Sequence, residues 1–208
     1  MVRRLLHRKL MTGFRKDGGI RWRGLVWSPF VVLLTSAVLS QEMSIPVDVQ
    51  VQLMARIFSF DRVMDARAKD GMTIGILYQE RYRASASTAD EVEDLLGRVE
   101  GFPGGPYEVV RIPWENLADA ESRMRDQHVR ILYVAPLRSA DVRSIGEMCR
   151  SLHVPTFSGV SSYVHEGLAL GVERRGGKAS ILINLTAARQ SGCDFGSQML
   201  HIAEVIEE

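Results

Sequence analysis

Polar and charged side chains directly follow the first apolar run that is typical of a buried strand, residues 72–78. Gln79, Tyr82 and Arg83 belong to this polar segment, together with Arg81. Guanidinium groups beside hydroxyls bind carboxylates or phosphates through paired hydrogen bonds. The segment is therefore a candidate site for a small ligand or a partner protein. The simpler interpretation is a solvated loop with ordinary surface arginines.

Two serines, Ser161 and Ser162, follow a later strand-like run and are the other binding candidates. The order Gly159-Val160-Ser161 is similar to a nucleophile elbow. That motif requires a second glycine two residues after the serine, where this chain has Tyr163. We therefore expect one of the two serines to cap a short helix. We expect no catalytic residue and no enzymatic activity.

These candidates must be positioned by a fold in which strands and helices alternate. Hydrophobic spacing and capping residues predict helices at residues 47–64, 88–99, 116–127 and 139–152, and strands at 72–78, 107–112, 129–134 and 154–158. Thr88 and Glu91 fit a capping box at the start of the second helix. Two further strands flank Gly176-Gly177, a pair suited to a tight hairpin turn.

Alternation of this kind favours parallel βαβ units. We expect residues 41–208 to form one domain, a three-layer α/β/α sandwich with a mainly parallel sheet and an antiparallel strand in the C-terminal hairpin. Ligands of open parallel sheets bind beyond the carboxyl ends of the strands. The loops to consider are therefore 79–85, 113–115, 135–139 and 159–162.

The N-terminal 40 residues differ in composition from the rest. They carry eight Lys/Arg and one acidic residue, whereas residues 41–208 carry 18 Lys/Arg and 24 Asp/Glu. A basic stretch followed by the apolar run 25–39 is typical of a secretory signal. We expect residues 1–40 to be a signal peptide, cleaved near Ser40, or an uncleaved N-terminal anchor, and the body to be periplasmic. Its mildly acidic charge argues against nucleic-acid binding.

Cys149 and Cys193 are the only cysteines. Two thiols in an oxidising compartment can form a disulfide, whereas a buried apolar thiol is the simpler interpretation of Cys149. The Cys and His spacing fits no zinc site, and we expect no metal and no cofactor.

The C-terminal block, residues 168–206, combines the hairpin with Ile183-Asn184-Leu185 and a short helical segment that ends at Arg189. We expect Asn184 to cap that segment and Arg189 to interact favourably with its last carbonyls. Ser197 and Gln198 open a closing helix that we expect to run to the end of the chain.

This block resembles the C-terminal signature of the YfiR-like family, and Ile74-Gly75-Ile76 is similar to the family's first strand. The resemblance implies a periplasmic, non-catalytic regulator. Such a protein binds and modulates a membrane-bound signalling partner, such as a diguanylate cyclase that controls cyclic-di-GMP and biofilm formation. The alternative is a periplasmic module that binds a small ligand. A homodimer is compatible with either.

Overall fold

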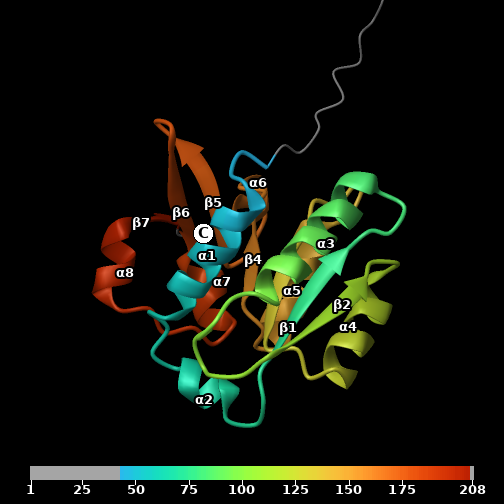
Figure 1. The fold of residues 1–208 in the computed structure, drawn as a ribbon, viewed down its shortest axis with the longest axis horizontal. Helices are drawn as coiled ribbons and strands as arrows, with labels where there is room; N and C mark the ends of the chain where they lie inside the picture. The colour runs from blue at the N-terminus through green and yellow to red at the C-terminus, as the bar shows by residue number, and fades with distance from the viewer. Residues whose placement is uncertain (1–42, 207–208) are drawn as a thin grey trace, which may run out of the picture. The chain divides into compact units, whose positions relative to one another are not determined.

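The structure, a computed structural model, describes residues 43–206. Within this range, seven strands form one sheet in the order β2-β1-β3-β4-β5-β6-β7 (Figure 1). The strands are β1 (Thr73–Tyr78), β2 (Glu108–Pro113), β3 (Ile131–Val134), β4 (Thr156–Ser158), β5 (Leu170–Arg175), β6 (Lys178–Asn184) and β7 (Ala203–Ile206). The helices are α1 (Val47–Phe58), α2 (Met64–Ala68), α3 (Arg83–Leu96), α4 (Leu117–Asp126), α5 (Val142–Ser151), α6 (Ser162–His165), α7 (Leu185–Gln190) and α8 (Ser197–Ile202).

Strands β1 to β5 are parallel to one another, and β6 pairs antiparallel with β5. Gly176 and Gly177 form the turn between β5 and β6, with φ angles of 57° and 80°. Positive φ at both central residues is what a type I′ hairpin turn requires, and glycine adopts it without steric cost. The mainly parallel sheet with a C-terminal antiparallel hairpin is therefore confirmed.

Helices cover both faces of the sheet. The side chains of α1 and α3 share one apolar core with β1, whereas α4 and α5 pack in a second core on the opposite face (Figure 1). Ile76 belongs to the first core and its neighbour Leu77 to the second, because successive side chains of a strand point to opposite faces. The three-layer sandwich is confirmed.

Two predicted N-terminal features are wrong. The helix expected at residues 47–64 ends at Phe58, and α2 starts separately at Met64. Between the two helices, Asp61 forms an isolated antiparallel β-bridge with Phe195. This tertiary contact interrupts the helix that the hydrophobic spacing predicts. The capping box at Thr88 is also wrong, because α3 already starts at Arg83 and Thr88 is a buried residue inside it.

The prediction of a closing helix that runs to the end of the chain is also wrong. Helix α8 starts at Ser197 as predicted but ends at Ile202, and the chain continues as β7. Strand β7 pairs in parallel with β6, Ile181 opposite Ala203. Without β7, the outer N–H and C=O groups of β6 would lack partners, and pairing satisfies them. The sheet therefore gains an edge strand that helical spacing did not reveal.

The remaining expectations concern the ends of the chain and its capping residues. Asn116 caps α4 as predicted, its side chain accepting a hydrogen bond from the N–H of Asp119. Helix α5 starts three residues later than expected, at Val142, because Asp141 caps it.

Of residues 43–206, no helix is long and apolar enough to cross a membrane. The predicted signal or anchor at residues 1–40 lies outside the described residues.

Candidate functional site

A crevice of about 600 Å³ opens at the carboxyl ends of β1, β2 and β3. Its lining residues are Gln79, Glu80, Arg81, Tyr82, Pro113, Trp114, Glu115, Arg138 and Ser139. From β1 the chain passes to β2 on one side and then to β3 on the other. In an open α/β sheet, ligands usually bind in the crevice where the strand order changes direction in this way. The crevice volume is within the range of small-molecule pockets.

The crevice is held together by Gln79. Its Oε1 accepts a hydrogen bond of 2.7 Å from the N–H of Arg138, and its Nε2 donates one of 2.9 Å to the carbonyl of the same residue. The loop after β1 is thereby joined to the loop after β3. Because both bonds involve only the backbone of Arg138, its side chain is left available to the crevice.

Tyr163 of α6 holds the loop after β3 in place through hydrogen bonds to its backbone. The Tyr163 hydroxyl accepts a hydrogen bond of 2.7 Å from the N–H of Leu137 and contacts its carbonyl oxygen at 3.2 Å. At the tip of this loop, Ser139 has a φ of 54°. Non-glycine residues rarely adopt left-handed backbone, and it persists where surrounding contacts impose it. The wall of the crevice is therefore a constrained loop.

Aromatic and charged groups share the lining. The guanidinium carbon of Arg138 lies 4.7 Å from the centre of the Tyr82 ring, a cation–π contact. Trp114 is half-buried and packs against the core below. The backbone N–H of Trp114 donates to the carbonyl of Tyr78 at 2.6 Å. Glu80 and Glu115 are exposed acidic groups of the same lining.

These groups are suited to binding. Guanidinium groups bind carboxylates and phosphates, carboxylates bind ammonium groups, and aromatic rings provide apolar contact surface. The lining contains no His, Cys or Lys, and its Glu80, Glu115 and Ser139 are residue types that serve in binding as well as in acid–base or nucleophilic chemistry. Among the described residues, no group of three or more His, Cys, Asp and Glu side chains could hold a metal ion.

The structure brings together part of the predicted set. Gln79 and Tyr82 line the crevice, and Arg83 is the exposed first residue of α3. Ser161 and Ser162 lie at the start of α6, outside the lining residues. The predicted serine cap is not formed, because neither the N-cap Ser161 nor another side chain accepts a capping hydrogen bond there.

Three of the four loops considered from the sequence, 79–85, 113–115 and 135–139, contribute to the crevice lining, and the loop at 159–162 does not. Trp114 and Glu115 belong to the loop at 113–115, and Arg138 and Ser139 to the loop at 135–139. Their position directly after strands was the available signal. Which side chains converge, however, depends on the order of strands in the sheet.

The C-terminal motif residues lie elsewhere. Asn184 caps α7 as predicted, with Oδ1 accepting a hydrogen bond of 2.9 Å from the N–H of Ala187. Arg189 lies in the last turn of α7 and is exposed. Ser197 and Gln198 are exposed at the start of α8 and line a second hollow with Phe60 and Arg62.

Replacing Asn184 by Ala is expected to lower the free energy of unfolding by about 1 kcal/mol, because the cap of α7 is lost. Urea denaturation measures the change. Arg189→Ala, on the same helix but exposed, serves as the control and is expected to alter stability by less than about 0.5 kcal/mol. Equal effects of the two substitutions would contradict the capping role.

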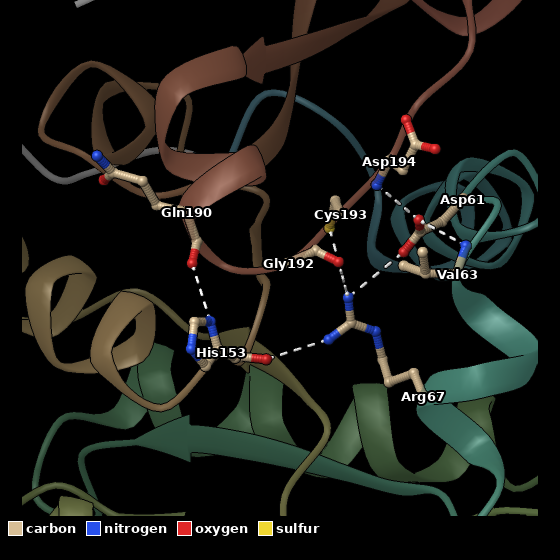
Figure 2. Close-up of polar contacts among 8 residues, drawn as sticks. All are labelled: Asp61, Val63, Arg67, His153, Gln190, Gly192, Cys193 and Asp194. Carbon is tan, nitrogen blue, oxygen red and sulfur yellow. Dashed lines mark hydrogen bonds and ion pairs between the residues drawn. The ribbon is translucent and has the colours of Figure 1, made fainter.

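A buried polar cluster lies beside α2 (Figure 2). The guanidinium of Arg67 is 3.5 Å from the carboxylate of Asp61 and donates hydrogen bonds to the carbonyls of His153 and Gly192 at 3.1 and 2.8 Å. Asp61 in turn accepts hydrogen bonds from the N–H groups of Val63 and Asp194. The cluster joins α2, the turn before β4 and the loop after α7, and the sequence pattern did not indicate it.

Both cysteines are free and buried. Cys149 lies in the core on the α4 and α5 face, and Cys193 in the core on the α1 and α3 face. The structure thus shows no disulfide between them and agrees with a buried thiol at Cys149. Burial raises the pKa of the Cys149 thiol to about 12 and also raises that of Cys193, so both thiols are protonated at neutral pH.

Solved structures with a similar fold include one described as a substrate-binding protein and one solved with a bound ligand. A conserved domain protein from Vibrio cholerae O1 biovar eltor matches with a TM-score of 0.55 at 15% identity, covering 78% of this chain and 60% of that protein. An ABC domain in complex with L-Trp from Streptococcus pneumonia matches with a TM-score of 0.56 at 16% identity, covering 77% and 62%.

A third is a substrate-binding protein with adhesive properties from Clostridium difficile, in its ligand-free, open structure. Its TM-score is 0.50 at 13% identity, covering 70% of this chain and 57% of that one. This chain therefore spans about 60% of the length of these structures, and at such identities the likeness shows the fold alone. Among curated proteins, none matches the sequence significantly.

The family comparison covers most of the described chain. The model of the YfiR/HmsC-like family matches residues 48–204, from the second residue of α1 to the second residue of β7. The match includes the crevice, the Arg67 cluster and the C-terminal hairpin. This protein belongs to the YfiR/HmsC-like family.

Proposed function

We propose that this protein is a periplasmic, non-catalytic regulator that binds a membrane-bound signalling protein, such as a diguanylate cyclase, and modulates its activity. The observation that carries the proposal is the family match over residues 48–204. Membership in this family supports a periplasmic regulatory domain in general. The signalling partner and the link to cyclic-di-GMP are the more specific parts of the proposal.

The crevice supports the same view. Its lining combines arginines, carboxylates and aromatic rings, groups that can hold a ligand by ion pairs, hydrogen bonds and apolar contact. Ser161 and Ser162 lie outside it, so the serines that most resembled a nucleophile do not line this crevice.

Deleting the gene tests the proposal. If the protein represses a diguanylate cyclase, the deletion strain should contain several-fold more cyclic-di-GMP, and expression of the intact gene should restore the original level. Mass spectrometry of cell extracts measures the nucleotide. Unchanged cyclic-di-GMP in planktonic and surface-attached cells would contradict the cyclase version.

We also propose that the protein binds a small ligand, as a second function compatible with the first. The specific observation in its favour is the position of the crevice at the carboxyl ends of β1, β2 and β3. A regulator with such a pocket can report the concentration of an envelope solute to its partner, provided that the ligand binds the two regulatory states unequally.

A further inference from the structure

We infer that residues 1–40 stay attached as an N-terminal anchor and that the carboxyl edge of the sheet, the side at which β1 to β5 end, lies against the lipid headgroups of the membrane. The inference goes beyond both proposed functions, because it assigns a surface to the bilayer itself. Three observations carry it: where the chain enters the body, how much chain precedes that point, and which side chains are exposed nearby.

The chain enters the described body at the carboxyl edge. Met43 packs against both cores, and its sulfur accepts a hydrogen bond of 3.5 Å from the Gln50 amide. The hydroxyl and carbonyl of Ser44 accept hydrogen bonds of 3.1 and 2.9 Å from Arg174. Arg174 is the last residue but one of β5, and Gln50 lies against Gly159, directly after β4. The start of the described chain and the β5–β6 hairpin tip accordingly lie together at the top of Figure 1.

The connection between the predicted anchor and the body is short. Only residues 40–42 separate Met43 from the apolar run 25–39. An extended chain gains at most about 3.5 Å per residue, so the steps from Leu39 to Met43 span at most about 14 Å. Strand β1 has six residues and is about 20 Å long. An uncleaved anchor therefore holds the carboxyl edge, and not the opposite edge, next to the headgroups.

The side chains exposed at this edge are of kinds that membrane interfaces contain. Tyr82 and Trp114 are half-buried in the lining of the crevice. Leu117, at the start of α4, is 36% exposed and is one of the two large exposed hydrophobic residues of the described chain. Trp and Tyr are enriched at the headgroup level of bilayers, and an exposed leucine beside them gains apolar contact with the acyl boundary.

The charges of the crevice lining are balanced. Glu80 and Glu115 accompany Arg81 and Arg138, so the lining has no net positive charge to attract an anionic surface. The contact then depends on the anchor and on the aromatic and apolar side chains. It should persist in about 1 M salt, in which electrostatic attraction extends only about 3 Å.

Trp114 provides a direct test, because it is the only tryptophan after residue 40. Trp22 and Trp27 are replaced by Phe, and the full chain is reconstituted into vesicles of phosphatidylethanolamine and phosphatidylglycerol. A nitroxide on some of the headgroups quenches tryptophan fluorescence on contact. We expect the fluorescence of Trp114 to be roughly threefold lower than in unlabelled vesicles, at low and at high salt. Equal fluorescence in labelled and unlabelled vesicles would overturn the inference.

A matched control moves the tryptophan to the other end of α4. Gln127 is the exposed C-cap of this ten-residue helix, at the amino edge of the sheet. Gln127→Trp combined with Trp114→Phe displaces the fluorophore by about 15 Å along α4, and its fluorescence should be the same in both kinds of vesicle. Far-UV circular dichroism checks that the two proteins fold alike. Equal quenching at the two positions would overturn the inference.

A substitution tests the contact without moving the probe. Leu117→Glu places a charge at the surface, and an acidic residue is favourable in the first turn of a helix, so the melting temperature should be kept. The quenching of Trp114 should fall by about half or more, because a carboxylate is costly at the acyl boundary. Gln127→Glu is the control and should leave the quenching unchanged. Unchanged quenching in Leu117→Glu would contradict the contact.

The anchor is tested separately by the mass of the protein recovered from cells. A full-length chain supports the inference, whereas a chain that begins near Gln41 overturns it, because nothing then holds this edge at the bilayer. None of these measurements involves cyclic-di-GMP. Failure of the lipid contact and failure of the cyclase partner are therefore separate results.

Discussion

Replacing Arg67 by Met is expected to lower the free energy of unfolding by about 3–5 kcal/mol, because it leaves a buried carboxylate without its cation. The side chain of Asp61 is 0% exposed and that of Arg67 is 9% exposed, so water cannot replace the lost charge. The carbonyls of His153 and Gly192 lose a donor at the same time. Urea denaturation followed by far-UV circular dichroism measures the change.

A matched control lies in the same region. Arg62 and Asp194 also form an ion pair, at 3.6 Å, but their side chains are 65% and 55% exposed. Arg62→Met should therefore cost less than about 1 kcal/mol. If both arginine substitutions destabilise the protein equally, burial is not the reason for the effect of Arg67.

The double variant Asp61→Asn with Arg67→Met separates charge from packing. Asparagine keeps an oxygen that can accept from the N–H groups of Val63 and Asp194, and it removes the unpaired charge. We expect the double variant to be more stable than Arg67→Met alone. A double variant that is less stable than the single one would show that lost contacts, and not the unpaired charge, dominate.

The second large effect is expected at Gly159, where Ala should destabilise the protein by about 2–4 kcal/mol. A β-carbon there would overlap the side-chain amide of Gln50, which is completely buried. The amide cannot easily move, since its Oε1 accepts from the Tyr133 hydroxyl at 2.6 Å and its Nε2 donates to the Ile45 carbonyl at 2.7 Å. Overpacking costs about 1–3 kcal/mol, and each buried polar group left unpaired adds to it.

Thermal and urea unfolding of Gly159→Ala are the measurements. Gly97→Ala is the control, since Gly97 ends α3 with a φ of −58° and an added β-carbon would approach no atom closer than 3.5 Å. It should change stability by less than about 1 kcal/mol. In the Gly159→Ala background, Gln50→Ala should cost less than it does alone, because it removes the overlap. Additive effects would contradict the proposed clash.

Local sequence patterns predicted most elements of the fold. The capping roles of Asn116 and Asn184 follow from contacts between residues three positions apart, and the Gly176-Gly177 turn follows from the φ angles that its two residues adopt. Such features are determined by residues within a short segment, and they can be predicted without information on the rest of the chain.

The errors occur where distant segments compete with a local pattern. Asp61 interrupts the N-terminal helix because its carboxylate is used by Asp194, far along the chain. The closing helix stops at Ile202 because β6 provides a free edge, with which Ala203 and its neighbours pair. Helical spacing was present in both segments, and the alternative contacts were stronger.

The sequence alone therefore determined the class of the fold, the likeness to a family and three of the four loops considered for a ligand site. Only the tertiary structure decided that Gln79 and Arg138 join two of those loops and that Glu115 lines the same crevice. It alone also revealed the buried pair of Asp61 and Arg67. The reason is physical: caps, turns and amphipathic spacing involve residues a few positions apart. Which side chains share a crevice or a buried cluster depends instead on strand order and packing, which the whole chain settles together.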